Sequence, residues 1–321
     1  MENCTNSSTV AGNSEAIAKA TICMLVLAVS LVENIMVLVV LKKNFSLRRR
    51  MRTNSFFIAN MSVADVLFAA QNIPHSYNYI VLNGHWILQG NIGMVFCKID
   101  MFFSLITMVT ANLTILAIAI HRFFVVYFPF KKIITRRVCF SIIFLTWLVS
   151  TLFASPMFYY ADLISENDFT TCTLTDVQVL KTWYTVLAGI LATTLVAMLV
   201  LYTAIGLKIW RRKFPGDANQ MAYLRREKQN HEIFKMLITL IVAFYVCSLP
   251  ILTLQLSFAL GFYEVLQVVH GRFIAVVMLC LNGAINPIIY VIFNKSFRDK
   301  VKVALSKCTC ARTAIYSLGK H

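Results

Sequence analysis

One acidic residue, Asp65, lies deep within an apolar stretch of the sequence, in the run ANMSVAD. A carboxylate is costly in such surroundings unless it meets a cation or hydrogen-bond donors, so an acidic residue of this kind is a functional candidate. Asn282 and Asn286 belong to a later apolar stretch and are able to face it. The structural alternative is a neutral Asp65 held by hydrogen bonds.

Pro250 and Pro287 interrupt two other apolar stretches. A proline inside a helix removes a backbone hydrogen bond, frees a carbonyl and creates a hinge. Two hinged helices packed on a straight one form an element with two states, which can carry an event from one end of the molecule to the other.

The remaining apolar stretches determine the fold class. Residues 100–121 carry only uncharged polar breaks after Asp100, and about 20 apolar residues at roughly 1.5 Å each span the ~30 Å hydrocarbon layer of a bilayer. Of the 321 residues, 59% are hydrophobic and 14% are charged, with a mean hydropathy of +0.71, which is too apolar for a soluble fold of this size. Seven segments of this kind occur, at about 17–41, 55–80, 95–127, 138–158, 181–210, 233–260 and 268–293. The sequence therefore predicts an all-α membrane protein with a bundle of seven transmembrane helices.

The basic residues lie in four clusters between these segments, at 42–54, 128–137, 208–235 and 295–321. Short loops rich in Lys and Arg stay on the cytoplasmic side, so we expect the N-terminus outside the cell and the C-terminus inside. The inner loops then carry most of the basic residues behind the net charge of +16, and they can contact anionic lipid. No nucleic acid is expected as a partner. We expect an extracellular tail at 1–16, the transmembrane domain at 17–293, and an amphipathic eighth helix with the cytoplasmic tail at 294–321.

This orientation predicts covalent modifications on both sides. Cys97 and Cys172 lie on the outer side, where oxidising conditions allow a disulfide between them. Asn3 and Asn6 head two glycosylation patterns in the outer tail. In the inner tail, Cys308 and Cys310 follow an amphipathic pattern and are candidates for palmitoylation, with a disordered tail as the alternative.

Twelve residues, spread over the seven segments and the loops beside them, form a recognisable pattern: Asn34, Asp65, Trp86, Cys97, Arg122, Trp147, Tyr202, Phe244, Pro250, Asn286, Tyr290 and Phe297. With these residues at these spacings, the chain resembles the rhodopsin-like G-protein-coupled receptors over nearly its whole length. The resemblance implies a receptor at the plasma membrane that passes the binding of an extracellular ligand to a heterotrimeric G protein, with arrestin as a further partner.

The resemblance also implies roles for individual residues. His121, Arg122 and Tyr202 would take part in G-protein coupling, and a switch would include Tyr290. The switch would also include Asp65, Asn282 and Asn286, the cluster that holds a sodium ion in family members. Ala111 stands where the family usually offers a hydroxyl to that ion. No other cofactor is expected.

Several residues near the switch depart from the family pattern. His121 replaces an acid before Arg122, and Asn230 replaces a second acid. Four other replacements are Glu33 for glycine, Asn112 for an aliphatic residue, Thr194 for proline and Ser248 for tryptophan. Because Arg122 loses both customary carboxylates, we expect signalling without ligand.

The ligand is predicted less directly. Ser104 replaces the aspartate of amine receptors, and Cys280 replaces the lysine of opsins, so both of these ligand classes lack their reactive group. The charged and aromatic outer face favours a peptide, and Asp100 is expected to meet a cationic part of it. The expected ligand-binding residues are His75, Asp100, Phe103, Ser104, Thr107, Ser248, Gln255 and Arg272.

A seven-helix membrane protein can also belong to other classes of function. A receptor for a non-peptide small molecule remains an alternative, as does a small transporter, although the inverted repeats typical of transporters are missing. An enzyme would need a nucleophile with a base, or a metal cluster. The sequence contains no H-E-x-x-H, no G-x-S-x-G and no pair of aspartates within one helix. We therefore expect neither an enzyme nor a metal site.

Overall fold

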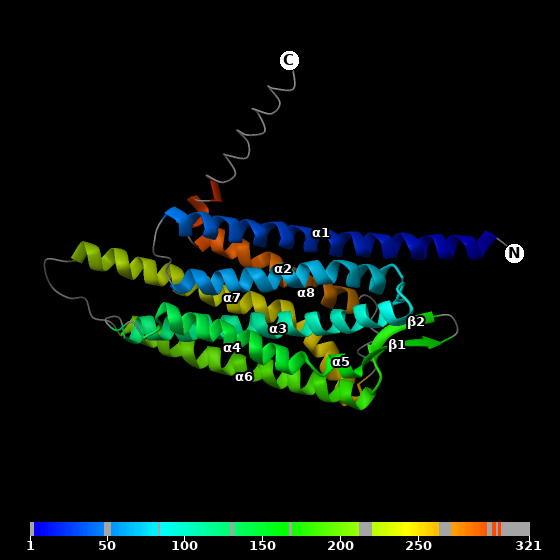
Figure 1. The fold of residues 1–321 in the computed structure, drawn as a ribbon. Helices are drawn as coiled ribbons and strands as arrows, with labels where there is room; N and C mark the ends of the chain where they lie inside the picture. Colours follow the sequence, from blue (N-terminus) through cyan, green and yellow to red (C-terminus); the bar gives the residue numbers. More distant parts are fainter. Residues whose placement is uncertain are drawn as a thin grey trace, which may run out of the picture.

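Long helices lying side by side make up most of the molecule in the computed structural model (Figure 1). The structure describes residues 3–47, 53–82, 84–128, 131, 133–166, 169–211, 220–262, 271–293, 297–299 and 301–302. The helices are α1 Asn3–Leu47, α2 Thr53–Ile80, α3 Gly90–Tyr127, α4 Arg136–Ala154, α5 Met157–Tyr160, α6 Val177–Trp210, α7 Gln220–Leu260 and α8 Gly271–Phe293. Two strands, β1 Ala161–Glu166 and β2 Phe169–Leu174, lie between α5 and α6.

Seven membrane-spanning helices are confirmed within the described residues, because α1, α2, α3, α4 with α5, α6, α7 and α8 are each long and apolar enough to cross a bilayer. Large apolar side chains cover the outside of the bundle, and Leu25, Phe144 and Val200 are all more than 60% exposed. Such exposure suits contact with lipid. Lipid tails are as apolar as leucine, so association between these helices rests on close packing and on hydrogen bonds between helices.

Two helices begin earlier than the sequence predicts. The first helix starts at Asn3, within the segment expected to be a polar tail, and α7 starts at Gln220. No proline precedes Pro74 in the chain, and adding residues to an existing helix costs far less than starting one. The backbone ladder of α1 therefore continues beyond the apolar span. At the other end of the chain, Cys308 and Cys310 lie outside the described residues.

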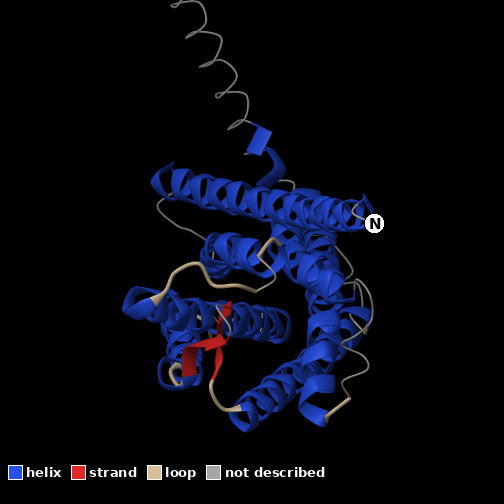
Figure 2. Cartoon of the chain, turned by 90° about the vertical axis from the view of Figure 1, so that its right-hand side faces the viewer, coloured by secondary structure: helices blue, strands red, loops and turns tan. Residues whose placement is uncertain are grey.

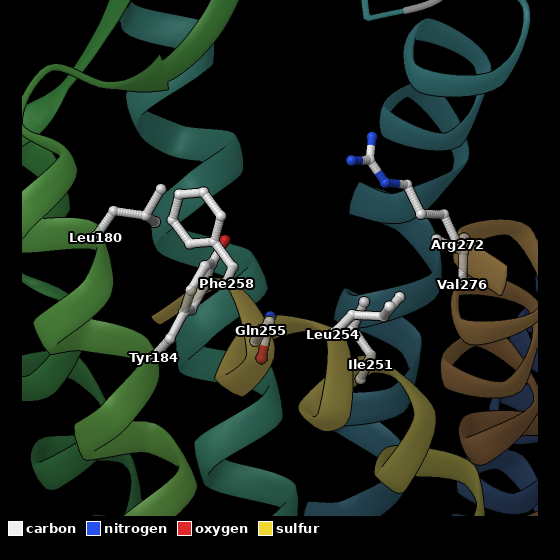
Figure 3. Close-up of a pocket in the computed structure, with 8 residues that line it drawn as sticks. All are labelled: Leu180, Tyr184, Ile251, Leu254, Gln255, Phe258, Arg272 and Val276. Atoms are coloured by element: carbon white, nitrogen blue, oxygen red, sulfur yellow. The ribbon is translucent and has the colours of Figure 1, made fainter. Parts of the chain in front are cut away.

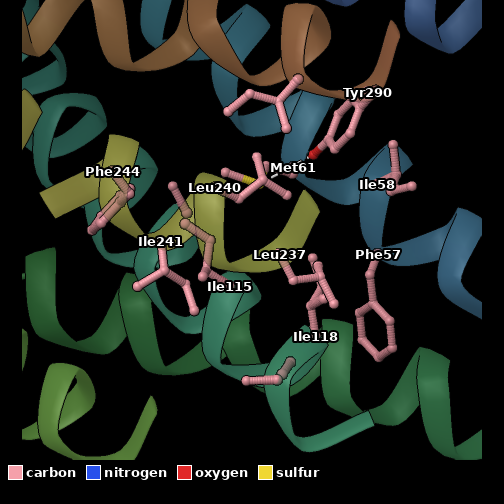
Figure 4. Packing of buried hydrophobic residues seen from close by; sticks show 14 of the residues in the cluster. Phe57, Ile58, Met61, Ile115, Ile118, Leu237, Leu240, Ile241, Phe244 and Tyr290 are labelled. Atoms are coloured by element: carbon pink, nitrogen blue, oxygen red, sulfur yellow. Dashed lines mark hydrogen bonds between the residues drawn. The ribbon is translucent and has the colours of Figure 1, made fainter. Parts of the chain in front are cut away.

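Helix α3 lies at the centre of the bundle and packs against α2, α4 and α6. Its contact with α2 and α4 includes a buried amide: Asn60 Nδ2 donates to Thr114 Oγ1 at 2.8 Å, and Trp147 Nε1 donates to Asn60 Oδ1 at 2.8 Å. The apolar core continues from α2 and α3 to α7 and α8 (Figure 4), with Met61, Ile115 and Phe244 among its buried side chains. The core thus joins α7 and α8, which contain Pro250 and Pro287, to the central helix.

The β1–β2 hairpin is an element that the sequence analysis did not predict. Its strands pair antiparallel, with Leu163 opposite Cys172. Figure 2 faces this end of the molecule and shows the strands, in red, over the ends of the helices. Trp86 ties the preceding loop to the hairpin by donating its backbone N–H to the carbonyl of Thr170 at 2.7 Å. The hairpin therefore covers one end of the bundle (Figure 2).

Candidate functional site

A disulfide between Cys97 of α3 and Cys172 of β2 fixes the hairpin to the bundle, as predicted. The two Cα atoms are 5.6 Å apart, and both residues pack with Trp86, Met157 and Leu174 in a small apolar cluster. The hairpin is thereby held beside the helix ends, where it contacts α3 and α6.

A cavity of about 220 Å³ lies between α6, α7 and α8 (Figure 3). Apolar side chains form most of its wall, and the ring of Tyr184 meets the ring of Phe258 edge-on at 6.1 Å. The lining residues are Leu180 and Tyr184 from α6, Ile251, Leu254, Gln255 and Phe258 from α7, and Arg272 and Val276 from α8. A cavity of this composition suits an apolar group that also carries a few polar atoms.

Two of the predicted ligand-binding residues, Gln255 and Arg272, line this cavity. The guanidinium of Arg272 projects from the start of α8 toward the other lining residues (Figure 3). Gln255 is half-buried, and its Oε1 atom has no hydrogen-bond partner among the described residues. Arg272 is the charged residue among those that line the cavity, so the cavity has positive character.

His75 and Asp100 lie elsewhere, at the contact between α2 and α3. Asp100 Oδ1 accepts a hydrogen bond from Gln71 Nε2 at 2.7 Å, and Asp100 Oδ2 lies 2.7 Å from His75 Nδ1. Asn72 Nδ2 donates to Gln71 Oε1 at 2.8 Å and extends the cluster. Both carboxylate oxygens of Asp100 thus have partners within the chain, so the geometry gives no support to the expected contact between Asp100 and a cationic ligand.

The other predicted ligand-binding residues also lie away from the cavity. Thr107 is buried and donates its hydroxyl to the carbonyl of Phe103 at 2.7 Å, and the ring of Phe103 packs edge-on against Phe102. Ser248 is buried on α7, and Ser104 is half-buried on α3. A ligand role for these residues stays a prediction.

Part of the cavity wall could have been predicted from a regular spacing of residues in α7. Ile251, Leu254, Gln255 and Phe258 stand at i, i+3, i+4 and i+7, which places them on one face of a helix. The cavity on α7 was not predicted, because apolar residues on a membrane helix give no sign of whether they face a neighbour, a cavity or lipid.

The Asp65 cluster connects three helices in the interior of the bundle. Asn286 Nδ2 of α8 donates to Asp65 Oδ2 of α2 at 3.0 Å, and Asn34 Nδ2 of α1 donates to the carbonyl of Gly283 at 3.0 Å. The pairing of Asp65 with Asn286 agrees with the prediction, whereas Asn282 is half-buried and makes no hydrogen bond to Asp65. Tyr290 lies nearby, with its hydroxyl 3.6 Å from Met61 Sδ (Figure 4).

Sodium does not fit this cluster in the way that the family resemblance implies. One oxygen of Asp65 already accepts from Asn286, and Ala111 on α3 offers no side-chain oxygen. A sodium ion needs several oxygen ligands, and this cluster offers too few of them. We therefore give sodium no role in the function of this protein.

Arg122 and Tyr202 meet at the opposite end of the bundle from the hairpin. They line a space of only about 20 Å³ together with apolar residues of α3, α6 and α7, and the rings of Tyr202 and Phe234 are 5.9 Å apart. His121 belongs to a different face of α3, where its ring packs edge-on against Phe57 of α2 at 5.8 Å. The α6 and α7 helices therefore close tightly over Arg122 in this structure.

Comparison with known proteins identifies the family. The model of the 7 transmembrane receptor (rhodopsin family) matches residues 33–290, so the chain belongs to that family. It is a G-protein-coupled receptor and a multi-pass protein of the plasma membrane, and it is not an enzyme.

Individual relatives give a narrower comparison. The chain is 30% identical to the Substance-K receptor of Bos taurus over 273 residues, which cover 81% of this chain and 69% of that protein. It is 28% identical to the Substance-P receptor of Aquarana catesbeiana over 302 residues, covering 91% of this chain and 71% of that protein. The Tachykinin-like peptides receptor 99D of Drosophila melanogaster is 25% identical over 280 residues, covering 82% of this chain and 53% of that protein.

Proposed function

We propose that the chain is a receptor for an extracellular peptide, which inserts one end into the cavity between α6, α7 and α8. The cavity itself is the observation that carries the proposal. Its volume of about 220 Å³ is below the ~300–1,000 Å³ usual for whole small-molecule ligands, so it suits a short part of a larger ligand. The printed names of the similar receptors, which include tachykinin-like peptides, support the same class.

The cavity also defines the chemistry of the inserted end. Arg272 supplies a positive charge, Gln255 supplies an amide, and the other lining side chains are apolar apart from the hydroxyl of Tyr184. A guanidinium forms its strongest hydrogen bonds with carboxylates, and it also binds carbonyl groups. The inserted end therefore carries an apolar side chain next to an acceptor group, and not the cationic group that the sequence alone suggested.

The disulfide supports one orientation in the membrane. A disulfide at Cys97 forms on the oxidising side, which favours an extracellular hairpin end and a cytoplasmic Arg122 end. This orientation puts Asn3 and Asn6 where glycosylation occurs, and it puts Cys308 and Cys310 where palmitoylation occurs. The inner basic loops would then contact anionic lipid and, after activation, a G protein or arrestin.

Helix α7 connects the two ends. It carries Phe258 at the outer cavity, Pro250 inside the helix, and Phe234 over Arg122 at the inner end. A proline inside a helix allows bending, so a ligand that pulls on the outer part of α7 can swing its inner part away from α3 and α6. That movement would uncover Arg122 and Tyr202 for the G protein.

A peptide library presented to cells that express the chain tests this function, with calcium and cyclic AMP as readouts. Each active peptide would then be applied to Arg272→Gln and to Lys98→Gln. Lys98 is a second cation near this end, and its Nζ donates to the carbonyl of Phe158 outside the cavity.

We expect Arg272→Gln to weaken activation by about 10- to 150-fold, the value of a hydrogen bond to a charged group, and Lys98→Gln to leave it within about twofold. A response to small amines or lipids with no response to peptides would favour a receptor for a non-peptide ligand. Equal losses in both variants would remove Arg272 from the ligand site.

A further inference from the structure

Three polar side chains from three different helices meet in the middle of the bundle. Asn112 Nδ2 of α3 donates to Thr194 Oγ1 of α6 at 2.9 Å, and the hydroxyls of Thr194 and Tyr245 of α7 are 3.2 Å apart. Tyr245 also donates to the carbonyl of Leu191 at 3.1 Å. Asn112 is fully buried, and Thr194 and Tyr245 are each 7% exposed. We refer to Asn112, Thr194 and Tyr245 as the interlock.

The hydrogen-bonding capacity of the interlock is well used. The Thr194 hydroxyl accepts from Asn112 and has the carbonyl of Ile190 at 2.9 Å as an acceptor for its own proton. Two other oxygens are alternative acceptors for the same proton, the carbonyl of Leu191 at 3.0 Å and Asn112 Oδ1 at 3.2 Å. Inside a membrane no water replaces a broken hydrogen bond of this kind, so separating the three helices would leave buried polar groups without partners.

The interlock uses two positions at which the sequence departs from its family. An aliphatic residue in place of Asn112, or a proline in place of Thr194, would offer no hydrogen-bonding side chain. Thr194 keeps the backbone N–H that a proline lacks, so α6 retains its ladder while the hydroxyl bonds back to the preceding turn. The two departures are therefore complementary, since Asn112 supplies the donor that Thr194 accepts.

The position of Tyr245 gives the interlock a mechanical consequence. Tyr245 lies on the inner side of Pro250, in the part of α7 that also carries Phe234 and Leu237 over Arg122. If this part of α7 swings outward about Pro250, Tyr245 must leave both Thr194 and the carbonyl of Leu191. The opening at the inner end and the breaking of the interlock are then the same movement.

We propose that the interlock is a regulatory device that holds α7 against α6 and α3 and sets how often the inner end opens without ligand. The proposal rests on the proposed receptor function, and it names the residues that oppose activation. Thr194 is the positioning residue of the device because it contacts both of the other members.

The test uses shape-conserving variants of the full-length chain. Thr194→Val and Tyr245→Phe remove hydroxyls, and Asn112→Leu removes the amide. Thr193→Val is the matched control, because Thr193 is the neighbouring exposed threonine and its hydroxyl bonds to its own helix, at the carbonyls of Gly189 and Ile190. Basal G-protein signalling is measured at equal surface expression.

We expect Thr194→Val and Tyr245→Phe each to raise basal signalling about fivefold, the effect of losing one typical buried hydrogen bond, while Thr193→Val leaves it unchanged. Combining Asn112→Leu with Thr194→Val should add little to either single change, because the two residues share one interaction. A merely structural role would instead lower expression and signalling together. Where the parent protein signals measurably, unchanged basal signalling in both hydroxyl variants would overturn the proposal.

A second readout does not depend on coupling to a G protein. Spin labels at cysteines introduced at Leu207 of α6 and Glu232 of α7, both exposed, report the distance between the inner ends of these helices. Cys4, Cys308 and Cys310 are replaced by serine so that the labels react only where intended. Thr194→Val should increase a longer-distance population about fivefold over the parent. If this population grows while signalling stays silent, the interlock stands and the proposed function fails; if the distances stay the same, the interlock is wrong.

Discussion

Asp100 Oδ2 lies 2.7 Å from His75 Nδ1, and the two residues join α3 to α2 instead of facing the cavity. Gln71 holds the other carboxylate oxygen, and the Asp100 side chain is 9% exposed. The sequence presented both residues as ligand contacts. In the structure they form a contact between helices, and this difference changes what a substitution should do.

Asp100→Asn should therefore destabilise the receptor and leave the response of the surviving protein unchanged. It weakens a charge-assisted hydrogen bond, which typically contributes about 1.5 to 3 kcal/mol, and the thermal midpoint of detergent-solubilised receptor should fall. Glu166→Gln, on the exposed end of β1, is the control and should have no effect on the midpoint. A normal midpoint together with a weaker response to peptide would return Asp100 to the ligand site.

Loss of the disulfide should reduce both surface expression and ligand response. The bond joins residues 75 positions apart, for which the chain-entropy model gives about 4.5 kcal/mol of stabilisation. Cys97→Ser and Cys172→Ser should behave alike, and the double variant should be no worse than either. Flow cytometry with an N-terminal tag measures the expression. Full expression and response in either single variant would show that the hairpin does not need the bond.

Gly283→Ala should weaken the contact between α1 and α8. A Cβ atom at this position would lie 2.7 Å from Ser30 Oγ, in the region where Asn34 donates to the carbonyl of Gly283. We expect a loss of about 1 to 3 kcal/mol, seen as a lower thermal midpoint.

Gly189→Ala is the control for this change, because a Cβ atom there meets nothing within 4 Å. Alanine is the better helix former, so this variant should match or slightly exceed the parent in stability. If the two variants behave alike, close packing at Gly283 is not important.

His121→Asp should lower signalling in the absence of ligand. Asp restores next to Arg122 the negative charge that a histidine cannot supply, and the pairing would contribute about 1 to 2 kcal/mol, a roughly 5- to 30-fold shift in the resting equilibrium. His121→Asn is the neutral comparison and should stay near the parent. Reporter assays at matched expression measure the effect, and equal signalling in all three proteins would contradict it.

The membrane-spanning segments and the disulfide were predicted well from the sequence. Hydropathy, loop charge and the side of the membrane on which a cysteine lies can each be read from a single segment. The sequence did not predict the hairpin, since its strands of only six residues show no regular alternation of apolar and polar side chains. Contacts between helices were the hardest to predict. Whether Asp100 meets His75 or a ligand depends on the rotation and depth of two helices, and no local pattern records either. Asn112 and Thr194 stood out as departures from the family, yet only their 2.9 Å contact shows that they belong together.

The position of the bound peptide tests the central claim most directly. A photo-crosslinking phenylalanine analogue would be placed at 258 in the cavity, at 103 on the α3 face favoured by the sequence, and at 144 on the exposed outside of α4. Cells that express each variant are then irradiated in the presence of an activating peptide from the library. Covalent attachment of the peptide is detected as an increase in the mass of the receptor. We predict attachment at 258 with none at 144. Attachment at 103 without attachment at 258 would contradict the assignment of the cavity between α6, α7 and α8 as the ligand site.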